Sequence, residues 1–395
     1  MISVEEARAL VKAEVRAYGE ETIPLHQGIG RVLRENWTAD RDLPPYDRVT
    51  MDGIAISFDG GISQSTIEIE GLAKAGDPRQ TLLDPRKCLE AMTGAVLPER
   101  TDTIIRYEDL EISGKEVKIL TEVVKGQNVH TQGLDRKKGD LIVKEGTLLS
   151  AADIGVGAST GCHEISVATL PKVIVISTGD ELVEINETPA SHQIRRGNVY
   201  RIQAQLQKMG ITCDADHLVD ELDTIIHKLE GYLSSYDAVI LSGGVSKGKL
   251  DYIPDALKAC GVKKIFHKIT QRPGKPMWFG QKEGGAVVFG LPGNPVSSFM
   301  CFSIYVAMWL NETLGITMKA ERAVLSDDVE FKPDLTYFLE VSLSQDASGM
   351  LLAHPRKGNG SGDLANLVEA EAFIELTKGR DLYKAGEVYP IFRYR

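Results

Sequence analysis

The sequence of 395 residues is poor in cysteine and has no excess of positive charge. Its five cysteines, at positions 88, 162, 213, 260 and 301, are odd in number, and no two have Cys-x-x-Cys spacing. Neither a disulfide framework nor a cysteine-based zinc site is therefore expected. The formal net charge of −11 argues against nucleic acid or an anionic membrane as partner, because such partners select basic surfaces. An anionic ligand would need a local group of basic residues.

The sequence also lacks a long hydrophobic segment. The most apolar run, Phe299 to Leu310, is interrupted by Ser303 and is about half the length that a membrane span requires. The N-terminus, MISVEEARALVKAEV, has acids where a secretory signal would have basic residues. We expect a cytoplasmic protein with reduced cysteines.

The pattern of the chain changes along its length, which is sufficient for several domains. Short segments with frequent Gly, Pro and Asp, from about 42 to 138, predict an all-β unit. Between Pro171 and Gly315, segments rich in Val and Ile alternate with helical patterns, which predicts a doubly wound parallel sheet covered on both faces. From about 319 to 395, short strands and turns predict a small β-barrel-like unit.

Capping residues mark the start of three predicted helices. Ser3 with Glu6, and Ser150 with Asp153, have the spacing of a capping box. Asn294 stands before a proline, which predicts a helix that begins after Asn294 with this residue as its cap.

Ligands of an open α/β sheet bind outside the carboxyl ends of the strands, so the segments after the predicted strands are candidates. Four such segments are rich in small residues: 177–181, 242–248, 270–276 and 291–295. Glycines let backbone N–H groups approach an anion closely, and helix starts contribute partial positive charge. All four segments should lie on one edge of the sheet. Together they predict an anion site, although a single Gly-Gly pair is usually a plain turn and no Walker A motif is present.

Basic residues are concentrated near two of these segments. From Lys247 to Lys275, eight Lys or Arg residues stand against two Asp, a net charge of +6. Carboxylates among the cations, such as Glu181 and Asp251, are suitable ligands of a hard divalent cation. The residues alone therefore predict a phosphorylated ligand with Mg²⁺.

Six motifs in register resemble those of the molybdopterin molybdenumtransferases, the MoeA and gephyrin E-domain type. They are PPYDRVTMDGIAI (44–56), MTGAVLPERTDTIIRYED (92–109), ISTGDEL (176–182), LSGGVSKGKLDY (241–252), RPGKPMWFG (272–280) and GLPGNPVSS (290–298). The resemblance covers essentially the whole chain and implies an elongated protomer of multidomain α/β plus β class. Its four parts would be 1–20 with 171–317 as the molybdopterin-binding α/β domain, 21–45 with 139–170 as a linking domain, 46–138 as an inserted β domain, and 318–395 as a C-terminal β-barrel-like domain.

The resemblance also implies a reaction and partners. The family inserts molybdate into adenylylated molybdopterin in the presence of Mg²⁺ and releases AMP, so both adenylylated molybdopterin and molybdate are expected substrates. A homodimer is implied, and a contact with the molybdopterin adenylyltransferase is expected. Neither nucleic acid nor a membrane is expected as a partner.

The matching motifs imply functional residues. Those implied as catalytic are Asp52, Thr93, Glu181, Asp220, Asp251 and Lys275. Those implied as substrate-binding are Gly243, Gly244, Ser246, Lys268, Arg272, Pro292 and Asn294. Glu181 and Asp251 are the implied Mg²⁺ ligands. Lys275 and Arg272 would stabilise charge on molybdate and on the departing phosphate.

Four segments differ from the family pattern, the first being DRVTMDG (47–53), where Asn-Ser-x is commoner before Met-Asp-Gly. Arg195-Arg196 replaces an aspartate-containing stretch, and the arginine that is usual near Leu335 is missing. Ala365-Asn366 stands where paired serines are common. Arg356 with Ser361, or Arg195 or Arg196, are candidate substitutes, and tungstate stays open as the oxyanion.

Two other functions stay open at this point. An adenylyltransferase-like enzyme is one, because the α/β unit is shared, but that enzyme consumes ATP and the insertion reaction needs none. A non-catalytic scaffold that retains the fold is the other, and it would not bind adenylylated pterin.

Overall fold

The computed structural model describes residues 1–61, 66–245 and 252–395, which divide into two compact units. Unit 1 comprises residues 1–23, 28–34 and 166–395, and unit 2 comprises residues 24–27 and 35–165. Unit 1 is therefore built from chain segments that are distant in the sequence, whereas unit 2 is nearly continuous.

Unit 1 contains a six-stranded sheet in the order β16-β13-β17-β21-β20-β18. Its strands are β13 (Val173–Thr178), β16 (Cys213–Leu218), β17 (Ala238–Ser242), β18 (Val262–His267), β20 (Trp278–Lys282) and β21 (Val287–Leu291). The first four strands in this order are parallel, as the sequence predicts. The sequence did not predict β20, which forms an antiparallel hairpin with β21 and also runs antiparallel to β18. Because β20 runs antiparallel to both of its neighbours, β18 points in the same direction as β21.

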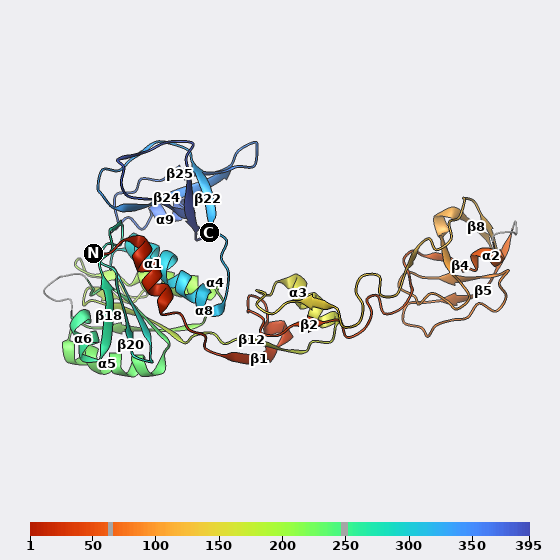
Figure 1. Ribbon diagram of the computed structural model, residues 1–395, viewed down its shortest axis with the longest axis horizontal. Coiled ribbons are helices and arrows are strands. Elements are labelled where there is room, and N and C mark those ends of the chain that lie inside the picture. Colours follow the sequence, from red (N-terminus) through yellow and green to blue (C-terminus); the bar gives the residue numbers. More distant parts are fainter. Residues whose placement is uncertain (62–65, 246–251) are drawn as a thin grey trace. The chain divides into compact units, whose positions relative to one another are not determined.

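Helices cover both faces of this sheet, as Figure 1 shows for α5 and α6 on one side and α1 and α8 on the other. They are α1 (Val4–Ala13), α4 (Gly197–Lys208), α5 (Leu222–Ser235), α6 (Ile253–Ala259), α7 (Pro295–Cys301), and α8 (Ala307–Leu314), which follows α7 through one π-helical stretch (Phe302–Val306). The predicted capping box of Ser3 and Glu6 is present at the start of α1. Every residue of β13, β17 and β21 is buried, because both faces of these strands are covered.

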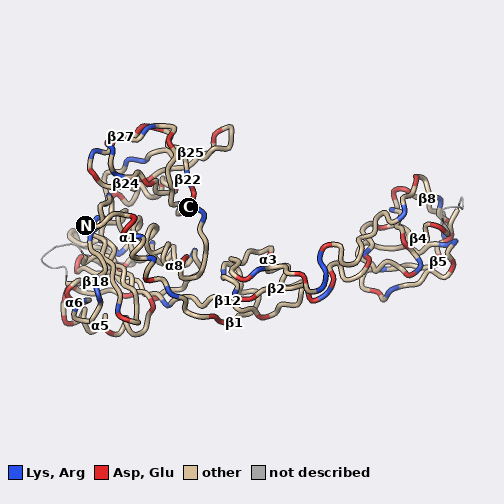
Figure 2. The backbone as a smooth tube through the Cα atoms, viewed as in Figure 1, with Lys and Arg blue, Asp and Glu red and all other residues tan. Residues whose placement is uncertain are grey.

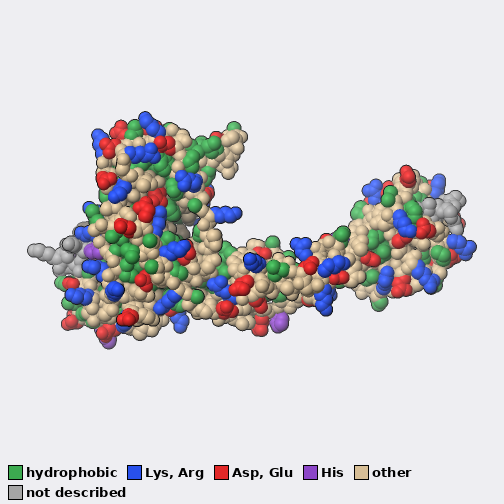
Figure 3. Space-filling view, viewed as in Figure 1, with side chains coloured by type: hydrophobic (Ala, Val, Ile, Leu, Met, Phe, Trp, Pro, Cys, Tyr) green, Lys and Arg blue, Asp and Glu red, His purple; other side chains and the backbone are tan. Residues whose placement is uncertain are grey.

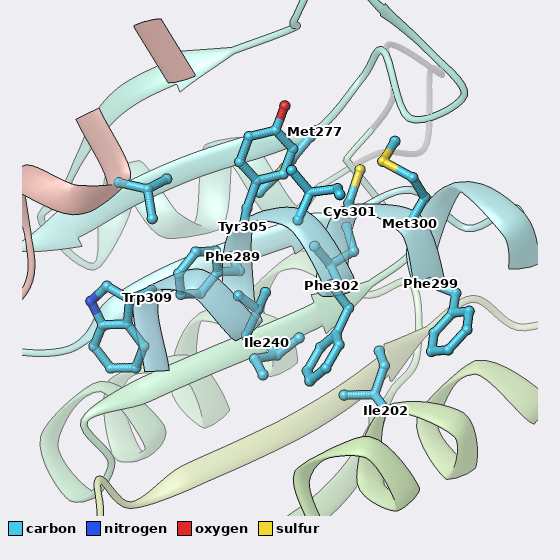
Figure 4. Close-up of a cluster of buried hydrophobic side chains, with 14 of the residues drawn as sticks. Ile202, Ile240, Met277, Phe289, Phe299, Met300, Cys301, Phe302, Tyr305 and Trp309 are labelled. Atoms are coloured by element: carbon cyan, nitrogen blue, oxygen red, sulfur yellow. The ribbon is translucent and has the colours of Figure 1, made fainter. Parts of the chain in front are cut away.

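Aromatic side chains fill the core between the sheet and α7–α8. Figure 4 shows Phe289 and Ile240 of the sheet against Phe302, Trp309 and Ile202. The rings of Phe289 and Trp309 meet edge to face, with centroids 5.8 Å apart. The apolar run that is too short to cross a membrane is thus the central buried helix of unit 1. Among the described residues, no helix is long and apolar enough to span a bilayer.

The C-terminal part of unit 1 is a closed barrel, which confirms the predicted barrel-like unit. Its five strands follow one another in the order β24-β25-β22-β28-β26, and β26 pairs with β24 to close the barrel. The short strand β19 (Gln271–Arg272) pairs with the start of β24, on the edge opposite β26. The strands are β22 (Glu321–Leu325), β24 (Thr336–Gln345), β25 (Leu351–Pro355), β26 (Ala372–Leu376) and β28 (Val388–Arg393). Phe338, Phe373 and Tyr394 of this part join Phe299 of α7 in one buried cluster, so the barrel and the α/β part share a core.

Unit 2 contains a second six-stranded sheet, in the order β7-β4-β6-β5-β9-β8. Its strands are β4 (Gly53–Ile56), β5 (Ile67–Ala73), β6 (Cys88–Ala91), β7 (Thr103–Arg106), β8 (Leu110–Ser113) and β9 (Glu116–Ile119). The sequence predicted the all-β character of this part but not β6. Elsewhere in unit 2, helix α3 (Ala151–Ser159) begins with the predicted capping box of Ser150 and Asp153.

Two crossing segments of unit 2, 39–48 and 129–140, connect the sheet to the rest of the unit. Leu43 N donates to Arg136 O at 2.8 Å, and Asp42 Oδ1 accepts from Lys138 N at 2.9 Å. Side chains of both signs follow one another along these segments (Figure 2), and on the face visible in Figure 3 acidic and basic groups are interspersed. The connection is therefore held mainly by backbone and carboxylate hydrogen bonds.

Candidate functional site

A cavity of about 1420 Å³ lies in unit 1, where the carboxyl ends of the parallel strands meet the barrel. All four segments predicted from the sequence contribute to it, because β13, β17, β21 and β18 end at the same edge. The barrel part adds Leu335, Tyr337, Glu340 and the glycine-rich segment 358–362. The cationic residues of the lining are Arg195, Arg196, Arg201, Arg272 and Lys275, and the acidic ones are Glu181, Asp220 and Glu340. The cavity walls thus carry an excess of positive charge inside an acidic chain.

Gly243 and Gly244 form the cavity wall after β17, and both adopt positive φ, 102° and 65°. A Cβ atom at Gly244 would lie 2.8 Å from Thr178 Oγ1 and 2.7 Å from Ile253 Cγ1. A Cβ at Gly243 would lie 2.9 Å from the same Thr178 oxygen. Only glycine therefore permits both this backbone conformation and this close approach to β13.

The Thr178 hydroxyl has no hydrogen-bond partner among the residues that the structure describes, although the residue is only 4% exposed. It stands at the end of β13, directly beside the Gly243-Gly244 wall. A buried hydroxyl without a partner is unfavourable, so this oxygen is a group that a ligand or a water can satisfy.

Two asparagines connect the strand-end loops. Asn198 Nδ2 donates to Ser242 Oγ at 3.0 Å and to Gly293 O at 2.8 Å, which fixes the first turn of α4 against two loops. Asn294 occupies the N-cap position of α7, as predicted, but its side chain makes no capping bond. Asn294 Nδ2 instead donates to Ser361 Oγ at 2.9 Å, because Ser361 of the barrel part lies within reach. The predicted cap role of this side chain is therefore wrong, and the residue joins the α/β part to the barrel.

The cations of the cavity differ in their partners. Arg196 Nε donates to Glu184 Oε2 at 2.9 Å, so its charge is largely neutralised. Arg195 is exposed, and its Nε donates to Glu187 O at 3.1 Å. Arg272 and Lys275 are also exposed, and Arg272 lies 5.9 Å from the ring centroid of Phe331. Within the described ranges, neither Arg272 nor Lys275 has an ion-pair partner, so both charges are available to a ligand.

Arg201 is the cation that lies deepest, on the second turn of α4. Burial lowers the pKa of its guanidinium from the usual range. Its Nη1 donates to Pro295 O at 3.1 Å, and its Cζ lies 5.6 Å from the ring centroid of Phe299. The α4 segment alone has the pattern of an amphipathic surface helix, so no local feature of the sequence points to this residue.

Glu340 is the one acid of the lining that is buried, at 7% exposure. Burial, with a smaller contribution from the Asp363 charge, raises the pKa of this carboxyl. It projects from the same face of β24 as Phe338, towards the α/β part. Glu181 is exposed and lies over Gly179, and Asp220 N donates to Asp180 Oδ1 at 3.1 Å.

Eight of the implied catalytic and substrate-binding residues line this cavity: Glu181, Asp220, Gly243, Gly244, Arg272, Lys275, Pro292 and Asn294. Lys268 does not, because it adopts positive φ (76°) in a turn whose backbone bonds to Met277 and Ile2. Ser246 and Asp251 lie outside the described residues. Of the candidate oxyanion substitutes, Ser361, Arg195 and Arg196 line the cavity, whereas Arg356 does not and instead donates to Ser342 Oγ at 3.1 Å.

Asp52 and Thr93 lie together in unit 2. Thr93 N and Thr93 Oγ1 both donate to Asp52 Oδ1, at 2.6 and 2.7 Å. The Thr93 backbone N–H, followed by the hydroxyl, lowers the pKa of the Asp52 carboxyl. The two residues therefore form one exposed anionic group.

The carboxylates of the cavity are the groups that could hold the predicted Mg²⁺. Among the described residues, no group of three or more His, Cys, Asp or Glu side chains could hold a metal ion by itself. Mg²⁺ usually takes one or two carboxylates and completes its shell with water and substrate phosphates. Glu181 and Asp220 supply oxygen donors of this kind in the cavity, so the lining fits Mg²⁺ that arrives with a phosphorylated ligand.

Comparisons with known proteins cover the whole chain. Residues 2–161 match the MoeA N-terminal region (domain I and II), 174–312 a probable molybdopterin binding domain, and 322–392 the MoeA C-terminal region (domain IV). The chain is 37% identical, over the full length of both, to a protein of Synechocystis named molybdopterin molybdenumtransferase. It is 29% identical to a protein of the same name from Staphylococcus epidermidis, with 99% of this chain and 95% of that protein covered. A solved molybdopterin biosynthesis MoeA protein from Pyrococcus horikoshii has 28% identity and a TM-score of 0.82, covering 100% of this chain and 99% of that one.

Proposed function

Because this chain belongs to the molybdopterin molybdenumtransferase family, we propose that its cavity binds adenylylated molybdopterin and molybdate, inserts molybdenum at the dithiolene, and releases AMP. The chain is a transferase of molybdenum cofactor biosynthesis. Each part of this reaction is assigned to residues of the cavity and of unit 2.

One observation carries the proposal: Arg272 and Lys275, which have no ion-pair partner among the described residues, lie in the same cavity as the Gly243-Gly244 wall. Both substrates are anions, and the chain as a whole is acidic. A cavity that concentrates cations, with backbone N–H groups open at glycines, is the place where such ligands are attracted.

Lys275 and Arg272 stabilise the negative charge on molybdate and on the departing phosphate. Charge stabilisation by groups already in position is usually the largest contribution to catalysis. Ser361 and the glycine-rich segment 358–362 supply further donors from the barrel side. These groups compensate for the arginine that is missing near Leu335.

The carboxylates and the glycine wall hold the rest of the substrate. Gly243, Gly244 and Ser246 contact the pterin or the adenylyl phosphate, and Pro292 and Asn294 border the same space. Glu181 and Asp251 are the proposed Mg²⁺ ligands, with Asp220 nearby in the lining. When bound, Mg²⁺ would supply positive charge to the phosphate oxygens.

Asp52 and Thr93 belong to the proposed reaction through a second copy of the chain. They lie in unit 2, and the remaining predicted site residues that the structure describes lie in unit 1. We propose a homodimer in which this anionic group completes the site of the partner. The protein would act in the cytoplasm, in contact with the molybdopterin adenylyltransferase that supplies its substrate.

The proposal is tested by single-turnover assays with purified protein, adenylylated molybdopterin, molybdate and Mg²⁺. We expect molybdenum incorporation and AMP release in equal amounts with no ATP present. Consumption of ATP would identify an adenylyltransferase instead. Failure to bind adenylylated pterin in calorimetry would identify a scaffold.

A further inference from the structure

Arg201 lies in the cavity wall, on helix α4. No carboxylate pairs with it in the part of the chain that the structure describes, and its only hydrogen bonds are to Pro295 O and, at 3.4 Å, to Asn198 Oδ1. Both acceptors are neutral. Its charge is therefore half-buried and uncompensated.

Other half-buried arginines of unit 1 lie beside a carboxylate or beside the negative end of a helix. Arg8 faces Glu375, and Arg196 faces Glu184. Arg34 donates to Leu314 O at the end of α8, where the helix carries partial negative charge. Arg201 lies instead near the N-terminal end of α4, where the helix carries partial positive charge. The surroundings of Arg201 therefore increase the need for an anion.

A second unsatisfied group lies on the same wall. The Thr178 hydroxyl is buried without a partner beside Gly243 and Gly244. Ser242, which precedes these glycines, is hydrogen-bonded to Asn198, and Asn198 contacts Arg201. A cation with no described anionic partner and a hydroxyl with no described hydrogen-bond partner are thus connected through Asn198, Ser242 and Gly243.

We propose that Arg201 binds a phosphate-type oxyanion of the ligand, namely the adenylyl phosphate, with the Thr178 hydroxyl as a second contact. Arg201 is assigned to a different anion from Arg272 and Lys275 because of its position. It borders the cavity on the α4 side, with Asn198, whereas Arg272 and Lys275 come from the segment after β18. Two separate groups of cations suit a reaction with two anionic partners. The inference rests on the proposed function for the source of the phosphate, but not for the presence of an anion at Arg201.

The test is calorimetric titration of the full chain with AMP, adenosine, inorganic phosphate and molybdate. Arg201→Gln removes the charge and keeps an N–H donor for Pro295 O. We expect its affinity for AMP to fall at least tenfold and its affinity for adenosine to stay unchanged. Arg16→Gln is the matched control, because Arg16 also lies over a ring (Tyr18, 5.0 Å) but outside the cavity, and it should bind AMP as the unchanged protein does.

The alternative is that Arg201 only fastens α4 to α7. In that case Arg201→Gln lowers the thermal midpoint while AMP affinity stays within twofold of the unchanged protein, and the proposal is overturned. Loss of molybdate affinity with unchanged AMP affinity would likewise overturn the proposal, because it would assign Arg201 to molybdate and not to the adenylyl phosphate. If Arg201→Gln does not fold, Arg201→Lys keeps the charge but loses the planar two-point contact that a guanidinium makes with an oxyanion. A several-fold fall in AMP affinity with unchanged adenosine affinity then supports the site, and an unchanged AMP affinity overturns it.

Thr178→Val gives an independent readout. The isosteric change removes the unpartnered hydroxyl, so the free protein should unfold at a higher temperature while AMP affinity falls several-fold. If the AMP affinity of Thr178→Val equals that of the unchanged protein, the Thr178 hydroxyl does not contact the phosphate, and that part of the proposal is wrong. An unchanged protein that binds phosphate or molybdate but not AMP would overturn the proposal, because no adenylyl phosphate would then be held in the cavity.

Discussion

Arg8 of α1 and Glu375 of β26 form a two-point ion pair, with N–O distances of 2.8 and 3.2 Å, that joins the first helix of the chain to the barrel. Glu375 is 4% exposed, and the Arg8 guanidinium also lies 5.1 Å from the ring centroid of Phe392. The pair therefore connects two parts of unit 1, α1 and the barrel, that are far apart in the sequence.

Removing one partner of this pair should be costly. Glu375→Ala leaves the Arg8 charge half-buried without a partner, which we expect to lower the free energy of unfolding by about 3 kcal/mol. Urea unfolding followed by circular dichroism measures the change. The control on the same helix is Lys12→Met, which breaks the exposed pair with Glu312 and should cost less than about 1 kcal/mol. Equal effects of the two variants would contradict the importance given to burial.

Gly244→Ala should damage both stability and binding. The new Cβ would lie 2.7 Å from Ile253 Cγ1 in a left-handed conformation, so we expect a loss of about 1–2 kcal/mol in unfolding free energy. AMP affinity should fall as the wall shifts. Gly231→Ala is the control, because nothing lies within 4 Å of its Cβ position in α5, and it should stabilise the helix by about 0.5–1 kcal/mol. A Gly244 variant as stable and as active as the original would refute the need for glycine.

Lys275→Ala should reduce molybdenum incorporation on the order of a hundredfold or more, because it removes a cation placed where charge develops. Quenched-flow measurement of AMP release at saturating substrate gives the rate. Lys263→Ala, in which an exposed lysine of β18 outside the cavity is removed, should keep the original rate. Near-normal turnover of the Lys275 variant would exclude the proposed role.

Glu340→Gln should make stability less dependent on pH. Burial raises the pKa of Glu340 in the folded state, so the folded protein holds this proton more tightly than the unfolded chain does. The carboxyl costs nothing below its unfolded pKa of about 4.3, and stability is lost as pH rises through the raised folded pKa. The variant should therefore unfold at a higher temperature than the original at pH 8, with a difference that shrinks towards pH 4. Glu330→Gln, at an exposed barrel position, should show no such trend.

The sequence predicted the α/β part well because its signals are local. Buried strands such as Ala238–Ser242 are short apolar runs followed by glycine, and parallel strands bring their carboxyl ends to one edge by geometry. The meeting of the four loops therefore followed from direction alone. Even the inserted β20 did not disturb it, because a strand on its far side regains the original direction.

Residues placed by contacts between distant parts could not be predicted in the same way. Arg201 belongs to a helix with ordinary amphipathic spacing, and its burial depends on α7. Glu340 alternates with apolar neighbours in β24, and nothing local shows that its face meets the α/β part. Asn294 had a suitable cap position, but a serine from 67 positions further along the chain competed for its side chain.

The order of synthesis places a constraint on how unit 1 is completed. Helix α1 emerges first, yet the groups that bury Val4, Ala7 and Val11 and neutralise Arg8 come from residues beyond position 173. Unit 2 is nearly continuous in the chain and can reach its native state while the rest is still being translated. The apolar stripe of the first helix must then stay exposed until α8, which packs against it, has been synthesised, so a chain that ends before α8 would keep this helix undocked and be prone to aggregate.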